Sequence, residues 1–182
     1  MNLFHTLASL EANDDFHLSR LLILLGVFSG KDGKETIGGL TKLAKLDFLL
    51  RYPVYLEQAL EAKNKSTNNV HVEDYEKKSV ESSMVRFRYG PWDFRYRRFI
   101  NSLVAKGLAT VNVKGRTIEI GLTPTGLQIM KILSEDTIFS DTVRRAKLLK
   151  THFNQKGTHL MKFIYETFPE VVTLRLGEKI QS

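Results

Sequence analysis

The side chains in this sequence most capable of chemistry are basic residues gathered in one stretch. Eight of them lie between Met84 and Arg116, where Asp93 is the only carboxylate. They are Arg86, Arg88, Arg95, Arg97, Arg98, Lys106, Lys114 and Arg116. Eight positive charges less one leave +7, which equals the formal net charge of the whole chain. A basic excess confined to one stretch is typical of a surface that binds a polyanion, either nucleic-acid phosphates or an acidic protein partner.

The residue types that catalysis needs show no comparable grouping. Among the five histidines no pair has the i, i+4 spacing of helical metal ligands, and no carboxylate cluster accompanies them. The chain has no cysteine, which excludes disulfides, thiolate metal sites and cysteine nucleophiles. The glycine-containing loop at 29–35 is one residue short of a phosphate loop, and Asp32 occupies the position of the magnesium-binding Ser or Thr. We therefore expect a protein that is not an enzyme and that holds no metal and no cofactor.

Three predicted elements position the basic side chains. Pro91 suits the first turn of a helix whose apolar residues recur at three- and four-residue steps up to Val104. Gly107 supplies the left-handed position that ends helices, and residues 108–122 alternate around Lys114-Gly115 as a hairpin does. Thr123-Pro124 is a cap followed by the first-turn proline of another helix. A helix, a small hairpin and a helix in this order form the core of a winged helix-turn-helix.

The remaining sequence predicts further helices. Residues 16–28 are apolar nearly all round, which is typical of a helix in the centre of a fold. Leucines at helical spacing predict a helix in 37–60 that breaks before Pro53, with Lys42, Lys45 and Asp47 on its solvent side. Residues 61–83 are polar and read as an insertion. After Leu133 we expect two more helices, the second capped by Thr158 and closed by Pro169, and then a terminal strand or arm over 171–176.

These elements predict a mainly α fold with a small β-hairpin in a chain of 182 residues. Residues 1–133 form the predicted winged-helix domain, which includes an N-terminal helix and the polar insertion near 61–83. Residues 134–182 form a C-terminal helical extension. The N-terminus lacks the basic region and long apolar core of a signal peptide, and the apolar run at 21–25 is too short to span a bilayer. The absence of cysteine fits a reducing compartment, so we expect a cytoplasmic protein.

Two stretches resemble one protein family. They are GLTKLAKLDFLLRYP at 39–53 and SMVRFRYGPWDFRY at 83–96, and both are similar to the middle component of bacterial ABC-three-component defence systems, which include the Lamassu antiphage type. The resemblance covers roughly residues 16–133. It implies a small non-catalytic adaptor that sits with an SMC-like ATPase and an effector, often a nuclease, in an assembly that responds to invading DNA. ATP hydrolysis and DNA cutting would belong to the other subunits.

A second interpretation is a free-standing winged-helix transcription regulator. It would use Arg95, Arg97, Arg98, Asn101 and Ser102 for contacts in a DNA groove. An adaptor binds large partners stoichiometrically, whereas a regulator forms a symmetric dimer on a palindrome, so the two interpretations differ in assembly state.

Overall fold

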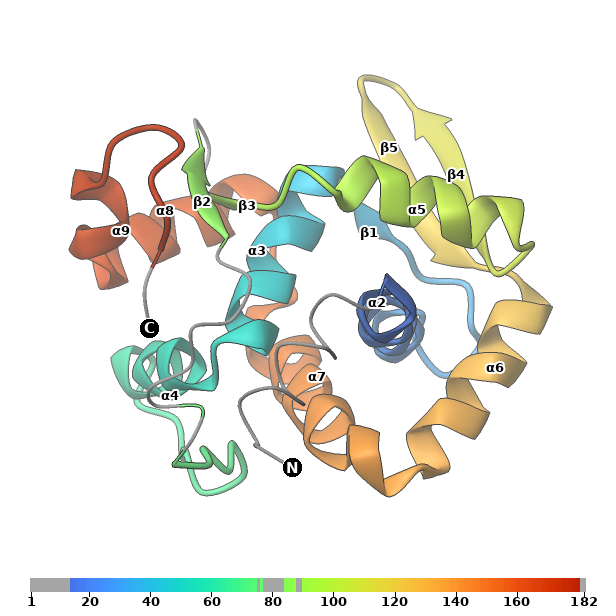
Figure 1. The fold of residues 1–182 in the computed structure, drawn as a ribbon, viewed down its shortest axis with the longest axis horizontal. Coiled ribbons are helices and arrows are strands. Elements are labelled where there is room, and N and C mark those ends of the chain that lie inside the picture. The colour runs from blue at the N-terminus through green and yellow to red at the C-terminus, as the bar shows by residue number, and fades with distance from the viewer. Residues whose placement is uncertain (1–13, 75, 77–83, 88–89, 181–182) are drawn as a thin grey trace, which may run out of the picture.

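The computed structural model describes residues 14–74, 76, 84–87 and 90–180. This part of the chain is mainly helical and carries a small antiparallel sheet (Figure 1). Its elements, in order, are α2 (Asp14–Phe28), β1 (Ile37–Gly38), α3 (Leu40–Arg51), α4 (Pro53–Ala62), β2 (Val85–Phe87), β3 (Gly90–Trp92), α5 (Tyr96–Ala105), β4 (Ala109–Lys114), β5 (Thr117–Leu122), α6 (Pro124–Glu135), the 3-10 turn η2 (Thr137–Phe139), α7 (Ser140–Phe153), α8 (Gly157–Thr167) and α9 (Pro169–Thr173). The helix expected near the N-terminus, before Asp14, lies outside the described residues.

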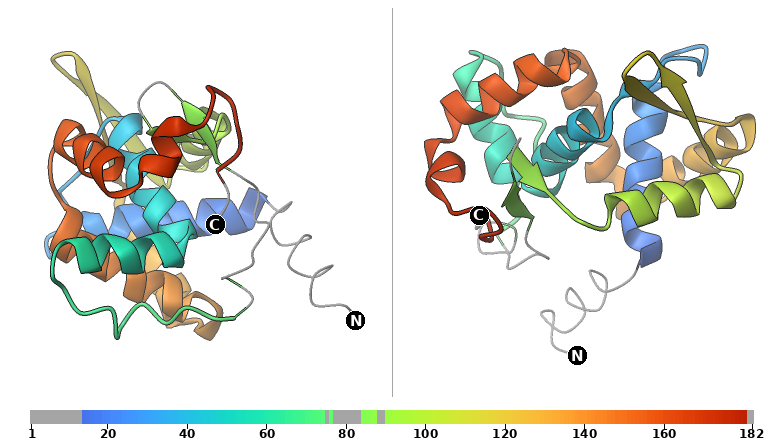
Figure 2. Two further views of the ribbon diagram at one scale, coloured as in Figure 1. Left: turned by 90° about the vertical axis from the view of Figure 1, so that its left-hand side faces the viewer. Right: turned by 90° about the horizontal axis from the view of Figure 1, so that it is seen from above.

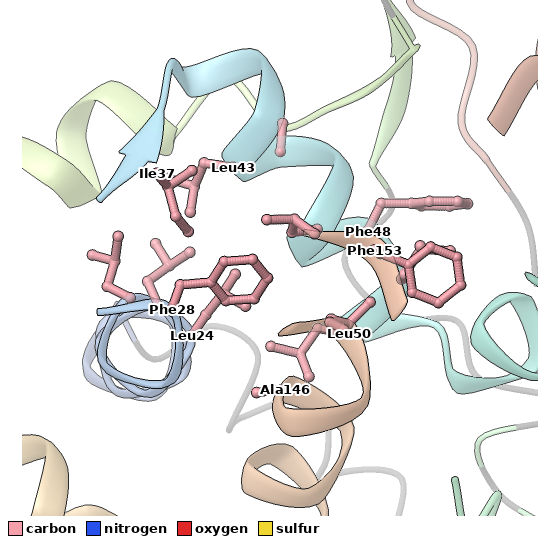
Figure 3. Close-up of a cluster of buried hydrophobic side chains, with 14 of the residues drawn as sticks. Leu24, Phe28, Ile37, Leu43, Phe48, Leu50, Ala146 and Phe153 are labelled. Carbon is pink, nitrogen blue, oxygen red and sulfur yellow. The ribbon is translucent and has the colours of Figure 1, made fainter. Parts of the chain in front are cut away.

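Helix α2 lies at the centre of the fold, as its all-round apolar composition predicts. It contacts α5, α6, α7 and β5, and its leucines are buried on every side. Figure 3 shows Leu24 and Phe28 of this helix facing Ile37 and Leu43. One connected hydrophobic cluster runs from Leu18 to Ile180, so the C-terminal helices share the core that α2 organises.

The small sheet has the strand order β1-β5-β4, and all of its pairs are antiparallel. The predicted hairpin is confirmed, but its turn is one residue later than expected: Lys114 pairs with Thr117, so the loop is Gly115-Arg116 rather than Lys114-Gly115. Gly115 opens the two-residue loop at φ +61°, a left-handed conformation that favours glycine. The predicted cap of α6 is also confirmed, because Thr123 Oγ1 accepts a hydrogen bond from the Gly126 N–H at 2.9 Å.

The start of α5 differs from the prediction. Pro91 does not open the helix but lies in β3, opposite Arg86 of β2, and the helix begins at Tyr96. Asp93 explains the later start, because its carboxylate accepts a hydrogen bond from the Arg95 N–H at 2.9 Å and its carbonyl accepts one from the Tyr96 N–H at 3.2 Å. Trp92 belongs to the strand, although its ring still packs edge-on against Tyr96.

Two predictions for the C-terminus are wrong. Helix α8 begins at Gly157 with no side-chain cap, so Thr158 lies inside its first turn. Pro169 both follows α8 and opens α9, which makes 171–173 helical where a terminal strand or an arm over 171–176 was expected. The chain then returns to the body, and the Ile180 N–H donates a hydrogen bond to the Met84 carbonyl at 2.8 Å. Helix α7 packs on α2 and α3, and α8 packs on α3 and α4.

The hairpin turn supplies a test of the fold. No atom lies within 4 Å of the position where a Cβ would stand on Gly115, so a substitution there meets only the cost of the left-handed backbone. We expect Gly115→Val to lower the free energy of unfolding by about 1–2 kcal/mol, and Gly115→Asn, which tolerates this conformation, by a few tenths of a kcal/mol. Urea denaturation of both variants measures the difference. Equal stabilities of the Val and Asn variants would contradict the turn geometry.

Candidate binding face and the buried network beneath it

A buried ionic network that the sequence did not reveal lies beneath the basic stretch. Its centre is Asp47 of α3, whose exposed fraction is 0%. The carboxylate accepts hydrogen bonds from Arg20 Nε at 2.7 Å, Arg20 Nη2 at 3.1 Å and the Tyr96 hydroxyl at 2.7 Å. Arg20 belongs to α2 and Tyr96 to α5, so one carboxylate joins three helices. The prediction that Asp47 faces solvent is therefore wrong.

The charge of Asp47 is stabilised within the protein interior. Burial by itself would raise the pKa of this carboxyl, but Arg20, and then Arg51 and the Tyr96 hydroxyl, hold the pKa below its ordinary value. Burial and the neighbouring Asp47 raise the pKa of Tyr96 well above its ordinary value. Tyr96 therefore remains a proton donor and Asp47 remains a charged acceptor.

Asp93 extends the network toward the surface. It accepts hydrogen bonds from Arg51 Nη1 at 3.1 Å and from Arg95 Nη2 at 2.8 Å. The Arg95 guanidinium also lies 5.3 Å from the centre of the Phe99 ring, and its Nη1 is 3.4 Å from His17 Nε2. Burial opposes the charge on Asp93, but the hydrogen bonds from Arg95 and the charge of Arg51 hold its pKa well below the ordinary value.

The prediction also placed Lys45 of α3 in solvent, but the structure buries this side chain. Its exposed fraction is 1%, and its Nζ donates a hydrogen bond to the Thr41 carbonyl at 3.1 Å. Strand β3 and helix α8 pack against α3, and Lys45 is covered as a result. Burial lowers the pKa of Lys45 to about 8. Lys42, the third of these residues, is half-buried and donates a hydrogen bond to Asn154.

The structure divides the predicted basic residues into two groups. Arg95 is held inward by Asp93, and Arg98 forms an ion pair with Asp14 at 2.8 Å on the surface. Four others are exposed and take part in none of the ion pairs among the described residues; we call them the open cations. They are Arg97 and Lys106 at α5, and Lys114 and Arg116 at the hairpin turn. Arg86 lies in β2, and Arg88 lies outside the described residues.

Comparison of the chain with protein-family models, with curated proteins and with solved structures finds no match. Within the described ranges, no three His, Asp or Glu side chains are grouped so that they could hold a metal ion. No described helix is long and apolar enough to cross a membrane.

Because Arg95 is paired with Asp93 and Arg97 is exposed, replacing these two arginines should change the stability of the protein by different amounts. We expect Arg95→Ala to destabilise the protein by about 1–3 kcal/mol, because it removes hydrogen bonds from a buried carboxylate. Arg97→Ala should change the stability by no more than about 0.5 kcal/mol, since its side chain is exposed. Thermal unfolding of the two variants side by side tests this difference. If both variants have the same melting temperature as the wild type, Arg95 does not contribute to stability.

The network also predicts a dependence of stability on pH. The folded-state pKa of Asp47 lies below its unfolded value, so its stabilisation is present above about pH 4 and is lost as the pH falls. We expect Asp47→Asn to cost about 3–5 kcal/mol at neutral pH, because it leaves Arg20 without its partner. Stability of this variant should fall less steeply than that of the wild type below pH 4. Urea titrations at several pH values measure both slopes, and identical slopes would rule out a charged Asp47 in the fold.

Proposed function

We propose that this chain is a non-catalytic winged-helix adaptor subunit of a bacterial antiphage defence complex. Its partners are an SMC-like ATPase and an effector nuclease. The order α2, β1, α3, α5, β4, β5 with the strand order β1-β5-β4 supports the winged-helix assignment. In this assignment α4, β2 and β3 form an insertion between the second and third helices of the module.

The observation that carries the proposal is the place of the two stretches that resemble the defence family. Residues 39–53 supply Asp47 and Arg51, and residues 83–96 supply Asp93, Arg95 and Tyr96. These five side chains form most of the buried network. A resemblance that falls on the residues joining α3 to α5 supports a shared architecture, because those residues set how the helices pack.

The open cations give the adaptor a surface on which to meet its partners. They are carried by α5 and by the hairpin, which contact each other through β4. Exposed cations without an internal partner suit a surface that meets acidic side chains or phosphates. ATP hydrolysis and DNA cleavage are assigned to the other subunits, and DNA is contacted through the complex.

A free-standing DNA-binding regulator is the second candidate. The exposed Arg97 and Asn101 on the outer side of α5 favour it, since these side chains are suited to a DNA groove. The inward position of Arg95 removes one of the contacts that this candidate requires.

Co-expression with the proteins encoded by the adjacent genes tests the proposal. We expect a stoichiometric complex by affinity purification and light scattering, and no nuclease or ATPase activity of the isolated chain. Reversal of all four open cations to Glu should weaken the complex by about tenfold or more.

The matched control for this variant reverses four exposed lysines that lie away from the basic stretch, namely Lys131, Lys147, Lys156 and Lys162. It makes the same change in net charge and should leave the complex intact. A wild-type chain that ignores both neighbours and binds a palindromic duplex as a symmetric dimer would establish the regulator instead.

A further inference from the structure

Among the buried charged side chains of the described residues, Lys45 of α3 stands apart because it has no counter-charge. Arg20, Arg51 and Arg145 are also buried, and each pairs with a carboxylate. Lys45 has an exposed fraction of 1%, and none of the ion pairs between described residues includes it. Its ammonium group carries three N–H bonds, one of which donates to the Thr41 carbonyl at 3.1 Å. A buried charge held by a backbone carbonyl alone costs free energy.

Strand β3 lies directly over the Lys45 side chain. A Cβ on Gly90 would stand 3.8 Å from Cε of Lys45 and 3.8 Å from Cε1 of Tyr165, so the first residue of β3 closes over the lysine beside α8. Figure 2 shows β2 and β3, in green, at the edge of the fold beside the C-terminal helices. The cover of Lys45 therefore includes a short strand at the periphery of the fold.

The described elements packed around Lys45 bring it no carboxylate. On α8 the nearby titratable side chain is Tyr165, while Glu166 is exposed and pairs with a lysine of the same helix at 3.7 Å. The carboxylates of Asp47 on α3 and of Asp93, which follows β3, are held by arginines. No described carboxylate therefore opposes the effect of burial, which lowers the pKa of Lys45 from an ordinary value of 10.5 to about 8.

The two elements that cover Lys45 are attached with different strength. Helix α8 buries Leu160 and Ile164 completely, and Phe168 at its end packs edge-on against Tyr55 with 4.9 Å between the ring centres. Strand β3 has three residues, and its firm attachment is at its far end, where Asp93 pairs with two arginines. The beginning of β3 is therefore the part of the cover that separates from α3 at the lowest cost.

We infer that the contact between β3 and Lys45 is a proton-sensitive joint, in which the Gly90 end of β3 opens readily while Lys45 is charged and stays closed when Lys45 is neutral. Opening returns the ammonium group to water and so removes the cost of burying it. A neutral amine is buried at a far smaller cost, so deprotonation favours the closed position. The inference concerns the chain by itself and goes beyond the proposed function.

The joint gives the dependence on pH a definite sign. The pKa of Lys45 is about 8 in the closed position and returns toward its ordinary value of 10.5 when the strand opens. The charge therefore favours opening fully at pH values below 8, and this preference disappears as the pH rises toward the ordinary value. The closed position becomes more populated over the same range.

Amide hydrogen exchange of the isolated chain, measured by NMR and divided by the intrinsic rates, tests the joint. In the wild type at about pH 7 the Gly90 amide should exchange at least about tenfold faster than the Leu24 amide of α2, because local opening precedes global unfolding. The protection of Gly90 should rise by about tenfold between about pH 7 and pH 9. Lys45→Met, which keeps the length of the side chain and removes its charge, should raise this protection by about tenfold or more at pH 7 and abolish the rise with pH.

The matched control is Lys42→Met. Lys42 lies on the same helix, is half-buried, and donates a hydrogen bond to Asn154 at 3.0 Å. Its replacement removes a charge from α3 without changing the group under β3, so the protection of Gly90 should stay as in the wild type.

Three results would overturn the inference. A Gly90 amide as well protected as Leu24 in the wild type would show that β3 does not open by itself. Equal slowing of exchange in the Lys42 and Lys45 variants would trace the effect to any loss of charge on α3. If Lys45→Met does not fold, the wild-type pH series decides alone, and a protection of Gly90 that stays constant as the pH rises contradicts the joint.

Discussion

The rest of this structure depends on one buried carboxylate. Asp47 has no contact with solvent and remains charged because Arg20 and Tyr96 replace its hydration with hydrogen bonds. Leaving such a charge unpaired costs several kcal/mol, so α2, α3 and α5 are stable together only where their polar groups meet. Apolar packing brings the helices into contact. The buried carboxylate then restricts them to an alignment in which Arg20 and Tyr96 both reach Asp47. The orientation of α5, and with it the exposure of Arg97, follows from this requirement.

That orientation explains why charges close in sequence serve different purposes. With Tyr96 and Phe99 turned into the core, Arg97 points to solvent, while Arg95 reaches inward to Asp93. Among the described residues, the basic stretch therefore contains an arginine that neutralises a buried carboxylate and others that are exposed. Arg95 contributes little to the long-range attraction of a polyanion, because Asp93 largely compensates its charge within the protein.

The helices that follow the hairpin complete this arrangement. Helix α8, together with strand β3, covers the side of α3 that carries Lys45, and burial lowers the pKa of this lysine. At the outer end of the β4–β5 hairpin, Val113 is left exposed. The described part of the chain thus combines a closely packed interior with a projecting hairpin, which fits the proposed adaptor role.

The sequence by itself determined the elements whose signals are local. The central position of α2, the hairpin around Gly115 and the Thr123 cap depend on neighbouring residues and on backbone conformation, so they can be read along the chain. Only the tertiary structure decided which charges are buried. Asp47 lies 27 residues from Arg20 and 49 from Tyr96, and the spacing of polar residues on α3 carries no information about such distant partners. A charged residue is stable on the covered side of a helix when another helix brings its counter-charge, and that meeting exists only after the helices have packed.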